Sequence, residues 1–179
     1  MKIYILGPVG SGKSTLAKKV SYALNIKYYE LDSIVWKKTI TGDVKRASSD
    51  RDKLFKKIIG RKNWIIEDVG RDCFKGALSQ ADIIIYIKLK RAVLYWRIFK
   101  RWIRQKFKIE MASYKCNLRM LIQMYRWASN DIKNKKLEKL LVYKDKLFIL
   151  DSKEIKKFEN STYITVFFKD CVVLLTKIC

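Results

Sequence analysis

The chain has 179 residues, a length that suits one domain with a sizeable core. It carries 40 Lys and Arg against 17 Asp and Glu, a formal net charge of +23, and no histidine. Catalysis by a histidine base is therefore excluded. The positive charge favours polyanionic partners, namely nucleotides, nucleic acid or anionic lipid, while a lysine-rich solvated surface is the plainer alternative.

The distribution of apolar residues and cysteines sets the expected location of the protein. No uncharged apolar run of 18 residues occurs, so we expect neither a membrane-spanning helix nor a membrane partner. The first residues continue directly into a glycine-rich stretch and do not resemble a cleavable signal. Cys73, Cys116, Cys171 and Cys179 are scattered without a CxxC pair. This pattern argues against a zinc site and predicts a reducing, cytoplasmic setting.

A glycine-rich stretch, GPVGSGKST at 7–15, follows an apolar run at 2–6 that predicts the first strand. It fits the phosphate-loop pattern of glycine, four residues and Gly-Lys-Ser/Thr, in which backbone N–H groups and the start of a helix surround an anion. Lys13 would reach the β- and γ-phosphates of ATP, and the Ser14 hydroxyl would bind Mg²⁺. An ordinary glycine-rich turn is the alternative. The expected nucleotide-binding residues are Gly7, Pro8, Val9, Gly10, Ser11, Gly12, Lys13, Ser14 and Thr15.

The remaining elements alternate between helices and continuous apolar strands. A helix is expected at 13–24 and a short strand at 27–31, and then a loop through Thr41, Gly42, Arg46, Ser48 and Ser49 leads to a helix that begins at Asp50 and stops at Gly60. Further strands are predicted at 64–66, 81–89 and 147–150, the last followed by a short helix capped by Asp151 or Ser152. This order predicts an α/β fold with three layers, α/β/α, around a parallel sheet of roughly five strands.

Ligands in such sheets bind beyond the carboxyl ends of the strands. This rule brings residues 7–14, Asp32, 67–71 and 89–91 to one rim of the sheet.

Between residues 90 and 144 the pattern changes to long helices. At about 100° per residue, a basic face opposes an apolar face of Tyr95, Phe99, Trp102 and Ile103. The basic face has three interpretations: a solvated surface, an arginine cluster that closes over a triphosphate, or a nucleic-acid or membrane contact. Its members are Arg97, Lys100, Arg101, Arg104 and Lys108.

Taken together, these segments resemble the adenylate kinase-like group of nucleoside and nucleotide kinases with a phosphate loop. Within that group they are most similar to the bacterial DNA topology modulation proteins, which are adenylate kinase-related. The resemblance covers about residues 1–158 as one kinase domain, with a helical lid inserted at about 90–144. Residues 159–179 match nothing in the family, and their apolar alternation suggests an added strand or a disordered end. The segments that carry the resemblance are GPVGSGKSTLAKKV, YYELDSIVW, NWIIEDV, ADIIIYI and LYWRIFKRWI.

The resemblance implies roles for individual residues. Lys13, Arg97 and Arg101 would be catalytic, the two arginines as part of the lid. Arg71 would hold the acceptor phosphate, although a surface arginine is the alternative, and Asp32 would touch the acceptor or the metal shell. Asp68 and Gly70 depart from the family pattern, where a glycine and a proline stand.

The implied activity is ATP-dependent phosphoryl transfer, with ATP and Mg²⁺, to a small acceptor such as a nucleoside monophosphate or a nucleoside. Asp32 or Glu67 would orient an acceptor hydroxyl or anchor Mg²⁺ through water. The alternative is an ATP-regulated protein that binds DNA through its basic surface and lacks robust kinase activity.

Overall fold

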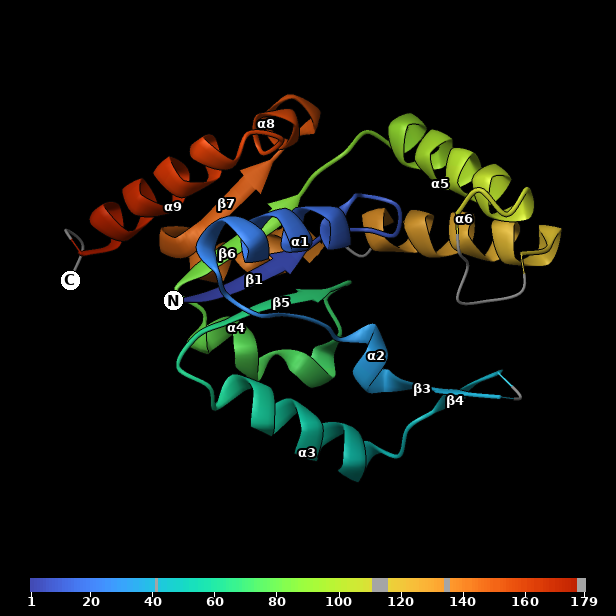
Figure 1. The fold of residues 1–179 in the computed structure, drawn as a ribbon, viewed down its shortest axis with the longest axis horizontal. Helices are drawn as coiled ribbons and strands as arrows, with labels where there is room; N and C mark the ends of the chain where they lie inside the picture. The colour runs from blue at the N-terminus through green and yellow to red at the C-terminus, as the bar shows by residue number, and fades with distance from the viewer. Residues whose placement is uncertain (41, 111–115, 134–135, 177–179) are drawn as a thin grey trace.

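The protein is built around a parallel sheet of five strands, in the order β2-β5-β1-β6-β7 (Figure 1). The computed structural model describes residues 1–40, 42–110, 116–133 and 136–176, so the expectations that fall on Thr41, 111–115, 134–135 and 177–179 lie outside the described residues. The five parallel strands confirm the predicted α/β fold with a parallel sheet of roughly five strands. The strands of the sheet are β1 (Lys2–Leu6), β2 (Tyr28–Glu30), β5 (Trp64–Asp68), β6 (Ile83–Ile87) and β7 (Leu147–Leu150).

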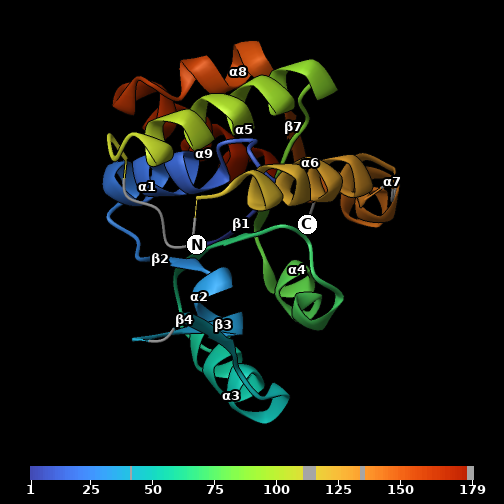
Figure 2. The same cartoon turned by 90° about the vertical axis from the view of Figure 1, so that its right-hand side faces the viewer.

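Continuous apolar strands need cover on both faces, and helices supply it. On one face, α1 (Lys13–Leu24), α8 (Ser152–Lys157) and α9 (Ser161–Thr176) pack against the sheet in one apolar cluster. Figure 2 shows helices on the opposite face of the sheet as well, where a second apolar cluster lies. It is covered by α2 (Asp32–Val35), α3 (Ser48–Ile59), the 3₁₀ turn η1 (Asp72–Phe74), α4 (Gly76–Gln80), α7 (Lys136–Leu140) and the 3₁₀ segment η2 (Leu141–Lys146).

The register of the three central strands places their carboxyl ends side by side. Leu6 at the end of β1 is opposite Asp68 of β5 and Tyr86 of β6. The glycine-rich loop after Leu6 therefore leaves the sheet at its centre, between the segments that follow β5 and β6. This is the rim that the sequence predicted for ligands.

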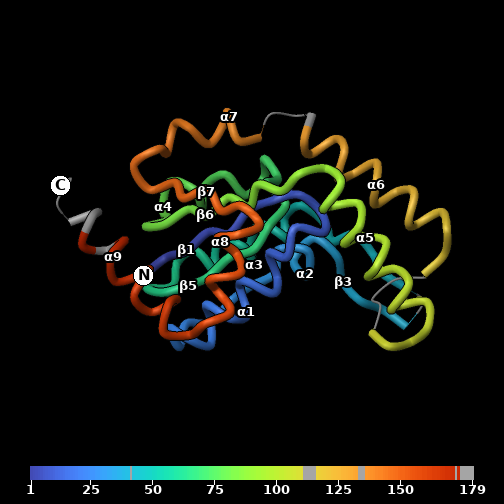
Figure 3. Tube along the Cα trace, turned by 90° about the horizontal axis from the view of Figure 1, so that it is seen from above, coloured from blue at the N-terminus to red at the C-terminus, as the bar shows by residue number. Residues whose placement is uncertain are grey.

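Two helices form an arm at the end of the molecule opposite α9 (Figure 3). They are α5 (Arg91–Lys106) and α6 (Leu118–Lys133), and they pack through Ile98, Leu121, Met124 and Ala128. The Tyr95 hydroxyl also shares a hydrogen bond with Ser129 of α6. The predicted apolar face of α5 does face its partner, but the helix ends at Lys106, so Lys108, with a φ of 57°, lies beyond it.

The segment before α3 differs from the predicted loop. Its first part, with the residues before it, forms an exposed antiparallel hairpin, β3 (Trp36–Thr39) and β4 (Gly42–Lys45), with Trp36 opposite Lys45. Gly42 has a φ of 129°, a conformation that favours glycine and allows the chain to reverse. The helix α3 then begins at Ser48 rather than at Asp50.

The expectation of a strand or a disordered end after residue 158 is wrong for the described part of this segment. Residues 161–176 form the helix α9, and the Asn160 side chain accepts hydrogen bonds from the N–H groups of Thr162 and Tyr163 at its start. Ile164, Phe168 and Cys171 are buried at helical spacing against the sheet. Burial of this face outweighs the strand preference of the Val and Phe residues. In the described part of the chain, no helix is long and apolar enough to span a membrane.

We predict that α9 stabilises the whole domain. Phe168→Ala should lower the free energy of unfolding by about 3–5 kcal/mol, because Phe168 is fully buried and its removal leaves a cavity. Val166→Ala on the exposed side of the same helix should change it by less than about 0.5 kcal/mol. Urea unfolding of both variants measures the difference, and equal losses would contradict the packing of α9 in the core.

Candidate active site

The phosphate loop connects β1 to α1, and its backbone can accept only small residues at two positions. Gly10 and Gly12 have φ values of 80° and 94°, which favour glycine. A Cβ atom at Gly10 would lie 2.7 Å from Cγ1 of Ile98 on α5. The glycines therefore permit both the turn of the loop and the close approach of the helical arm.

Polar groups around the loop fit a bound phosphate. Among the described residues, no side chain caps the start of α1, whose N-cap is Gly12, so the first N–H groups of the helix are open to an anion. The Ser11 hydroxyl is buried and has no hydrogen-bond partner within the described chain. A buried polar group without a partner is costly, and a phosphate oxygen would satisfy it.

Lys13, Ser14 and Glu67 form a compact charged group beneath the loop. Lys13 is 6% exposed; its Nζ donates to the Pro8 carbonyl at 3.0 Å and lies 3.7 Å from Oε1 of Glu67. The Ser14 hydroxyl donates to Oε2 of the same carboxylate at 3.0 Å. Glu67, the penultimate residue of β5, thus joins the two loop side chains that the sequence assigned to phosphate and to metal.

Burial controls the protonation of this group. It lowers the pKa of Lys13, against the opposing attraction of Glu67, and it raises the pKa of Glu67, against Lys13 and the Ser14 hydrogen bond. Each charged form is therefore less favourable here than in water, and a phosphate beside Lys13 and a cation beside Glu67 would favour both charges. Ser14 and Glu67 offer oxygen ligands of the kind Mg²⁺ takes alongside substrate phosphates. The described residues contain no cluster of three His, Cys, Asp or Glu side chains that would hold a metal by itself.

Asp32 and Arg71 meet on the neighbouring part of the rim. Asp32 begins α2 after β2, Arg71 follows β5, and the Arg71 guanidinium pairs with both Asp32 and Asp68. Burial alone would lower the pKa of Arg71, but the two carboxylates raise it above its ordinary value. The structure thus brings the two predicted acceptor residues together and adds Asp68, which the sequence noted only as a departure from the family pattern.

The predicted lid arginines differ in their distance from the loop. Arg97 is half-buried, and its Nη1 donates to the Ser11 carbonyl at 2.9 Å, so it lies directly on the phosphate loop. Arg101 is half-buried one turn further along α5. Arg104 is 3.8 Å from Glu110 and half exposed. Arg97 therefore lies directly on the loop, and Arg101 and Arg104 follow it along α5.

Two further side chains reach the rim, Asp131 from the end of α6 and Lys136 from the start of α7. The Lys136 Nζ donates to the Val69 carbonyl at 2.6 Å and pairs with Asp131 of α6. Asp131 is also one of the carboxylates that favour the charged form of Lys13. Nothing in the sequence pointed to this pair, because its position depends on how α6 and α7 return to the sheet.

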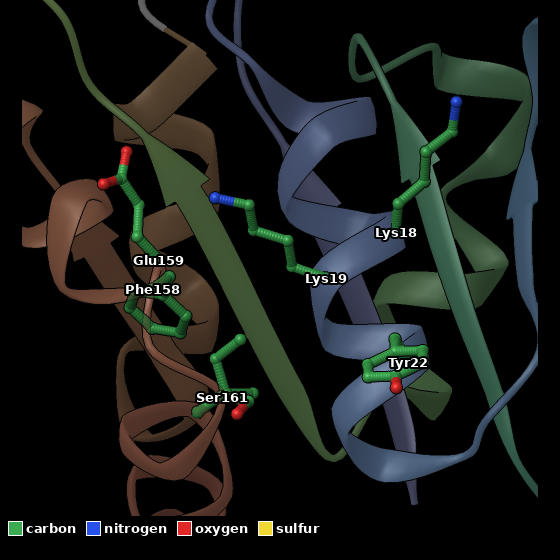
Figure 4. Close-up of a pocket in the computed structure, with 7 residues that line it drawn as sticks. Lys18, Lys19, Tyr22, Phe158, Glu159 and Ser161 are labelled. Atoms are coloured by element: carbon green, nitrogen blue, oxygen red, sulfur yellow. The ribbon is translucent and has the colours of Figure 1, made fainter.

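A cavity of about 290 Å³ lies beside the loop, lined by Gly10, Gly12, Thr15, Lys19, Arg97 and residues of α8 and its end. A second cavity of about 280 Å³ continues along α1 towards α9 (Figure 4). Lys19, Phe158 and Glu159 line both, and Figure 4 shows them extending from α1 and from the connection between α8 and α9. These walls were not predicted from the sequence, because α8 and α9 were not expected to lie beside the loop.

Comparison with solved structures identifies the fold. A deoxyadenosine kinase from M. mycoides with bound dATP is 18% identical, with 95% of this chain and 98% of that chain covered and a TM-score of 0.55. A shikimate kinase from Bacteroides thetaiotaomicron is 13% identical, with 94% and 97% covered and a TM-score of 0.52. The chain has the P-loop kinase fold. A gluconokinase from Sinorhizobium meliloti 1021 is also similar, at 13% identity, 99% and 92% coverage and a TM-score of 0.51. No protein-family model and no curated protein matches the sequence.

We predict that Lys13 is needed to bind ATP. Lys13→Ala should weaken ATP binding by about 10- to 100-fold, because a hydrogen bond to a charged partner contributes about 1.5–3 kcal/mol. Lys56→Ala, which removes an exposed lysine of α3 away from both cavities, is the matched control and should bind like the wild type. Isothermal titration measures the affinity and circular dichroism checks folding. Wild-type affinity in a folded Lys13→Ala variant would remove the phosphate-loop assignment.

Proposed function

We propose that the protein is a kinase that transfers the γ-phosphoryl group of ATP to a small acceptor. The observation that carries this proposal is the group of Lys13, Ser14 and Glu67 beneath the open N-terminus of α1. Arg97 of α5 adds a hydrogen bond to the phosphate loop. A simple anion site would need the loop alone. The acidic rim beside it, with Asp32 and Arg71, supplies the place for a second substrate.

Phosphoryl transfer requires positioning and compensation of charge more than covalent chemistry, so the absence of histidine is no obstacle. The loop N–H groups and Lys13 would hold the phosphate oxygens, and Arg97 would compensate charge that develops during transfer. Ser14 directly, and Glu67 directly or through water, would hold Mg²⁺, which neutralises the β- and γ-phosphates when bound. Arg101 would join Arg97 as the arm closes over the loop and excludes water.

The acceptor is proposed to be small. The three solved structures named above are kinases of deoxyadenosine, shikimate and gluconate by their names, and these are small hydroxyl compounds. The resemblance seen in the sequence points to a nucleoside or a nucleoside monophosphate. The cavities of about 290 Å³ and 280 Å³ lie along α1, on the other face of the sheet from α2 and Asp32, and would take the part of ATP beyond the phosphates.

A cytoplasmic location is part of the proposal. Cys73, Cys116 and Cys171 are free thiols, and Cys73 is exposed. Reduced cysteines are typical of proteins in reducing compartments such as the cytoplasm.

The alternative proposal is a nucleotide-regulated DNA-binding protein, and the net charge of +23 is the observation that favours it. On α5, Lys100 and Arg104 are exposed, whereas Arg97 and Arg101 are half-buried. A DNA contact would use the exposed members of this face, and a phosphate clamp would use the half-buried ones. The position of Arg97 on the loop supports the clamp.

We predict that Arg97→Ala lowers ATP turnover by about 100-fold or more, as removal of a donor to developing charge does in other enzymes. Arg101→Ala should cause a smaller loss and Arg104→Ala the smallest, because each lies a turn further from the loop. Lys100→Ala, which removes an exposed cation from the same helix, should retain wild-type turnover.

The same four variants test DNA binding. If Arg97 and Arg101 form a phosphate clamp, the four substitutions should change DNA affinity little. Fluorescence anisotropy across a series of salt concentrations measures this affinity. If the parent protein has no turnover, and Lys100→Ala and Arg104→Ala each weaken DNA binding and reduce the salt slope by about one unit, the alternative replaces the kinase proposal.

A further inference from the structure

The acceptor side of the rim is organised by one arginine between two carboxylates. The Asp68 side chain is fully buried, and its Oδ2 accepts hydrogen bonds from the N–H groups of Gly70 at 2.7 Å and Arg71 at 2.6 Å. The Arg71 guanidinium pairs through Nη1 with Asp68 and through Nη2 with Asp32. Asp68 thus fixes the loop and the guanidinium together, and Arg71 in turn holds the Asp32 carboxylate.

Other lysine and arginine side chains near residues 68–74 also pair with carboxylates. Lys136 donates to the Val69 carbonyl and pairs with Asp131. Lys75 is 2.9 Å from Asp72, in the turn that follows Arg71. Arg51 packs over the Phe74 ring and lies 2.7 Å from Asp52. The high net charge of the chain therefore does not leave these cations unpaired at the acceptor side.

The charge balance at Arg71 disfavours a phosphorylated acceptor. One guanidinium faces two carboxylates, Asp32 and Asp68, so the three groups carry a net charge of 1 − 2 = −1. A phosphate dianion at Arg71 would have to displace Asp32 and then remain close to a carboxylate of like charge. Like charges within about 4–6 Å of each other repel strongly, particularly where they are partly shielded from water. An acceptor without a phosphate meets no such cost.

We infer that the acceptor is an unphosphorylated hydroxyl compound, such as a nucleoside or a sugar, and that the Asp32 carboxylate held by Arg71 receives the proton of its hydroxyl group. This inference rests on the proposed kinase function and narrows it: a nucleoside monophosphate is not the acceptor. Arg71 is then a positioning residue rather than the ligand of an acceptor phosphate.

The position of Asp32 suits this role. Its side chain is 61% exposed, so it is accessible to a substrate, and Arg71 fixes its orientation. It also acts on Lys13 by electrostatic attraction, which places it on the same side as the phosphate loop. A hydroxyl between Asp32 and the γ-phosphate would therefore have a proton acceptor on one side and the phosphorus on the other.

The step balances without a further reactant. The acceptor O–H bond breaks and its proton passes to Asp32, while the acceptor oxygen forms a bond to the γ-phosphorus. The bond from the γ-phosphorus to the β,γ-bridging oxygen breaks, and its electron pair leaves with ADP. The products are ADP and a phosphate monoester, and the exposed Asp32 returns the proton to water.

Matched acceptor pairs test the inference. Transfer of the γ-phosphoryl group from labelled ATP is measured with the wild-type chain for each common nucleoside and deoxynucleoside and for its 5′-monophosphate, together with a panel of neutral sugars. We expect kcat/KM for the preferred hydroxyl compound to exceed that for every monophosphate by about 100-fold or more, because the phosphate of a monophosphate would face the carboxylates of Asp32 and Asp68. Lys13-dependent phosphorylation of a monophosphate at equal or higher efficiency overturns the inference and leaves the proposed function intact. A chain that transfers no phosphoryl group and does not bind ATP through Lys13 contradicts both.

A binding experiment tests the same charge balance without knowledge of the acceptor. Inorganic phosphate is titrated by ³¹P NMR into the protein with a non-hydrolysable ATP analogue in the donor site. Asp32→Asn should bind phosphate about tenfold or more tightly than the wild type, because Arg71 is released from one carboxylate. Asp72→Asn, which removes a neighbouring exposed carboxylate, is the control and should bind like the wild type. Equal phosphate affinity in the wild type and in Asp32→Asn would overturn the inference.

Discussion

The interaction on which the rest of the site depends is the contact of Lys13 with Glu67, whose charged atoms are 3.7 Å apart and whose side chains are 7% and 8% exposed. It links the phosphate loop to β5, and Glu67 also accepts the Ser14 hydrogen bond. Removal of one partner of such a buried pair costs about 3–5 kcal/mol, since the other charge is left uncompensated. The pair therefore holds Lys13 and Ser14 in place before any ligand arrives. In the account proposed here, phosphate then becomes the new partner of Lys13, and Mg²⁺ that of Glu67.

The distribution of charge around this pair separates two parts of the rim. The donor side has the loop N–H groups, Lys13 and Arg97, all of which suit a triphosphate. The acceptor side has Asp32 and Asp68 with a single arginine between them. A net charge of +23 would attract ATP over a distance, but at short range the individual ion pairs would decide which substrate the proposed site accepts.

Sequence alone predicted the elements whose pattern is local and strong. The apolar runs of β1, β5 and β6 specified the centre of the sheet, and because parallel strands end at one rim, Asp32 and Arg71 were correctly placed together. The two carboxylates that pair with Arg71 were not predicted from the sequence. Asp68 at the end of β5 was the available signal, since a buried carboxylate needs a cation nearby.

The features that the sequence missed depend on tertiary contacts. The segment 161–176 is rich in Val, Phe and Ile, which favour strands, and only packing against the sheet makes it a helix. The contact of Lys136 with Val69 requires the path of α6 and α7 back to the sheet, for which no short sequence pattern exists. The hairpin at 36–45 is exposed on both strands and lacks the apolar alternation that identifies a strand.

A crystal structure with Mg²⁺ and a non-hydrolysable ATP analogue would show whether Lys13 and Glu67 take phosphate and metal as their new partners. We expect Lys13 Nζ to leave the Pro8 carbonyl for an oxygen of the β- or γ-phosphate, and Mg²⁺ to bind the Ser14 hydroxyl with Glu67 beside it. Arg97 should remain over the loop. Triphosphate bound elsewhere on the basic surface, with Lys13 still on Pro8 and Glu67, would contradict the account.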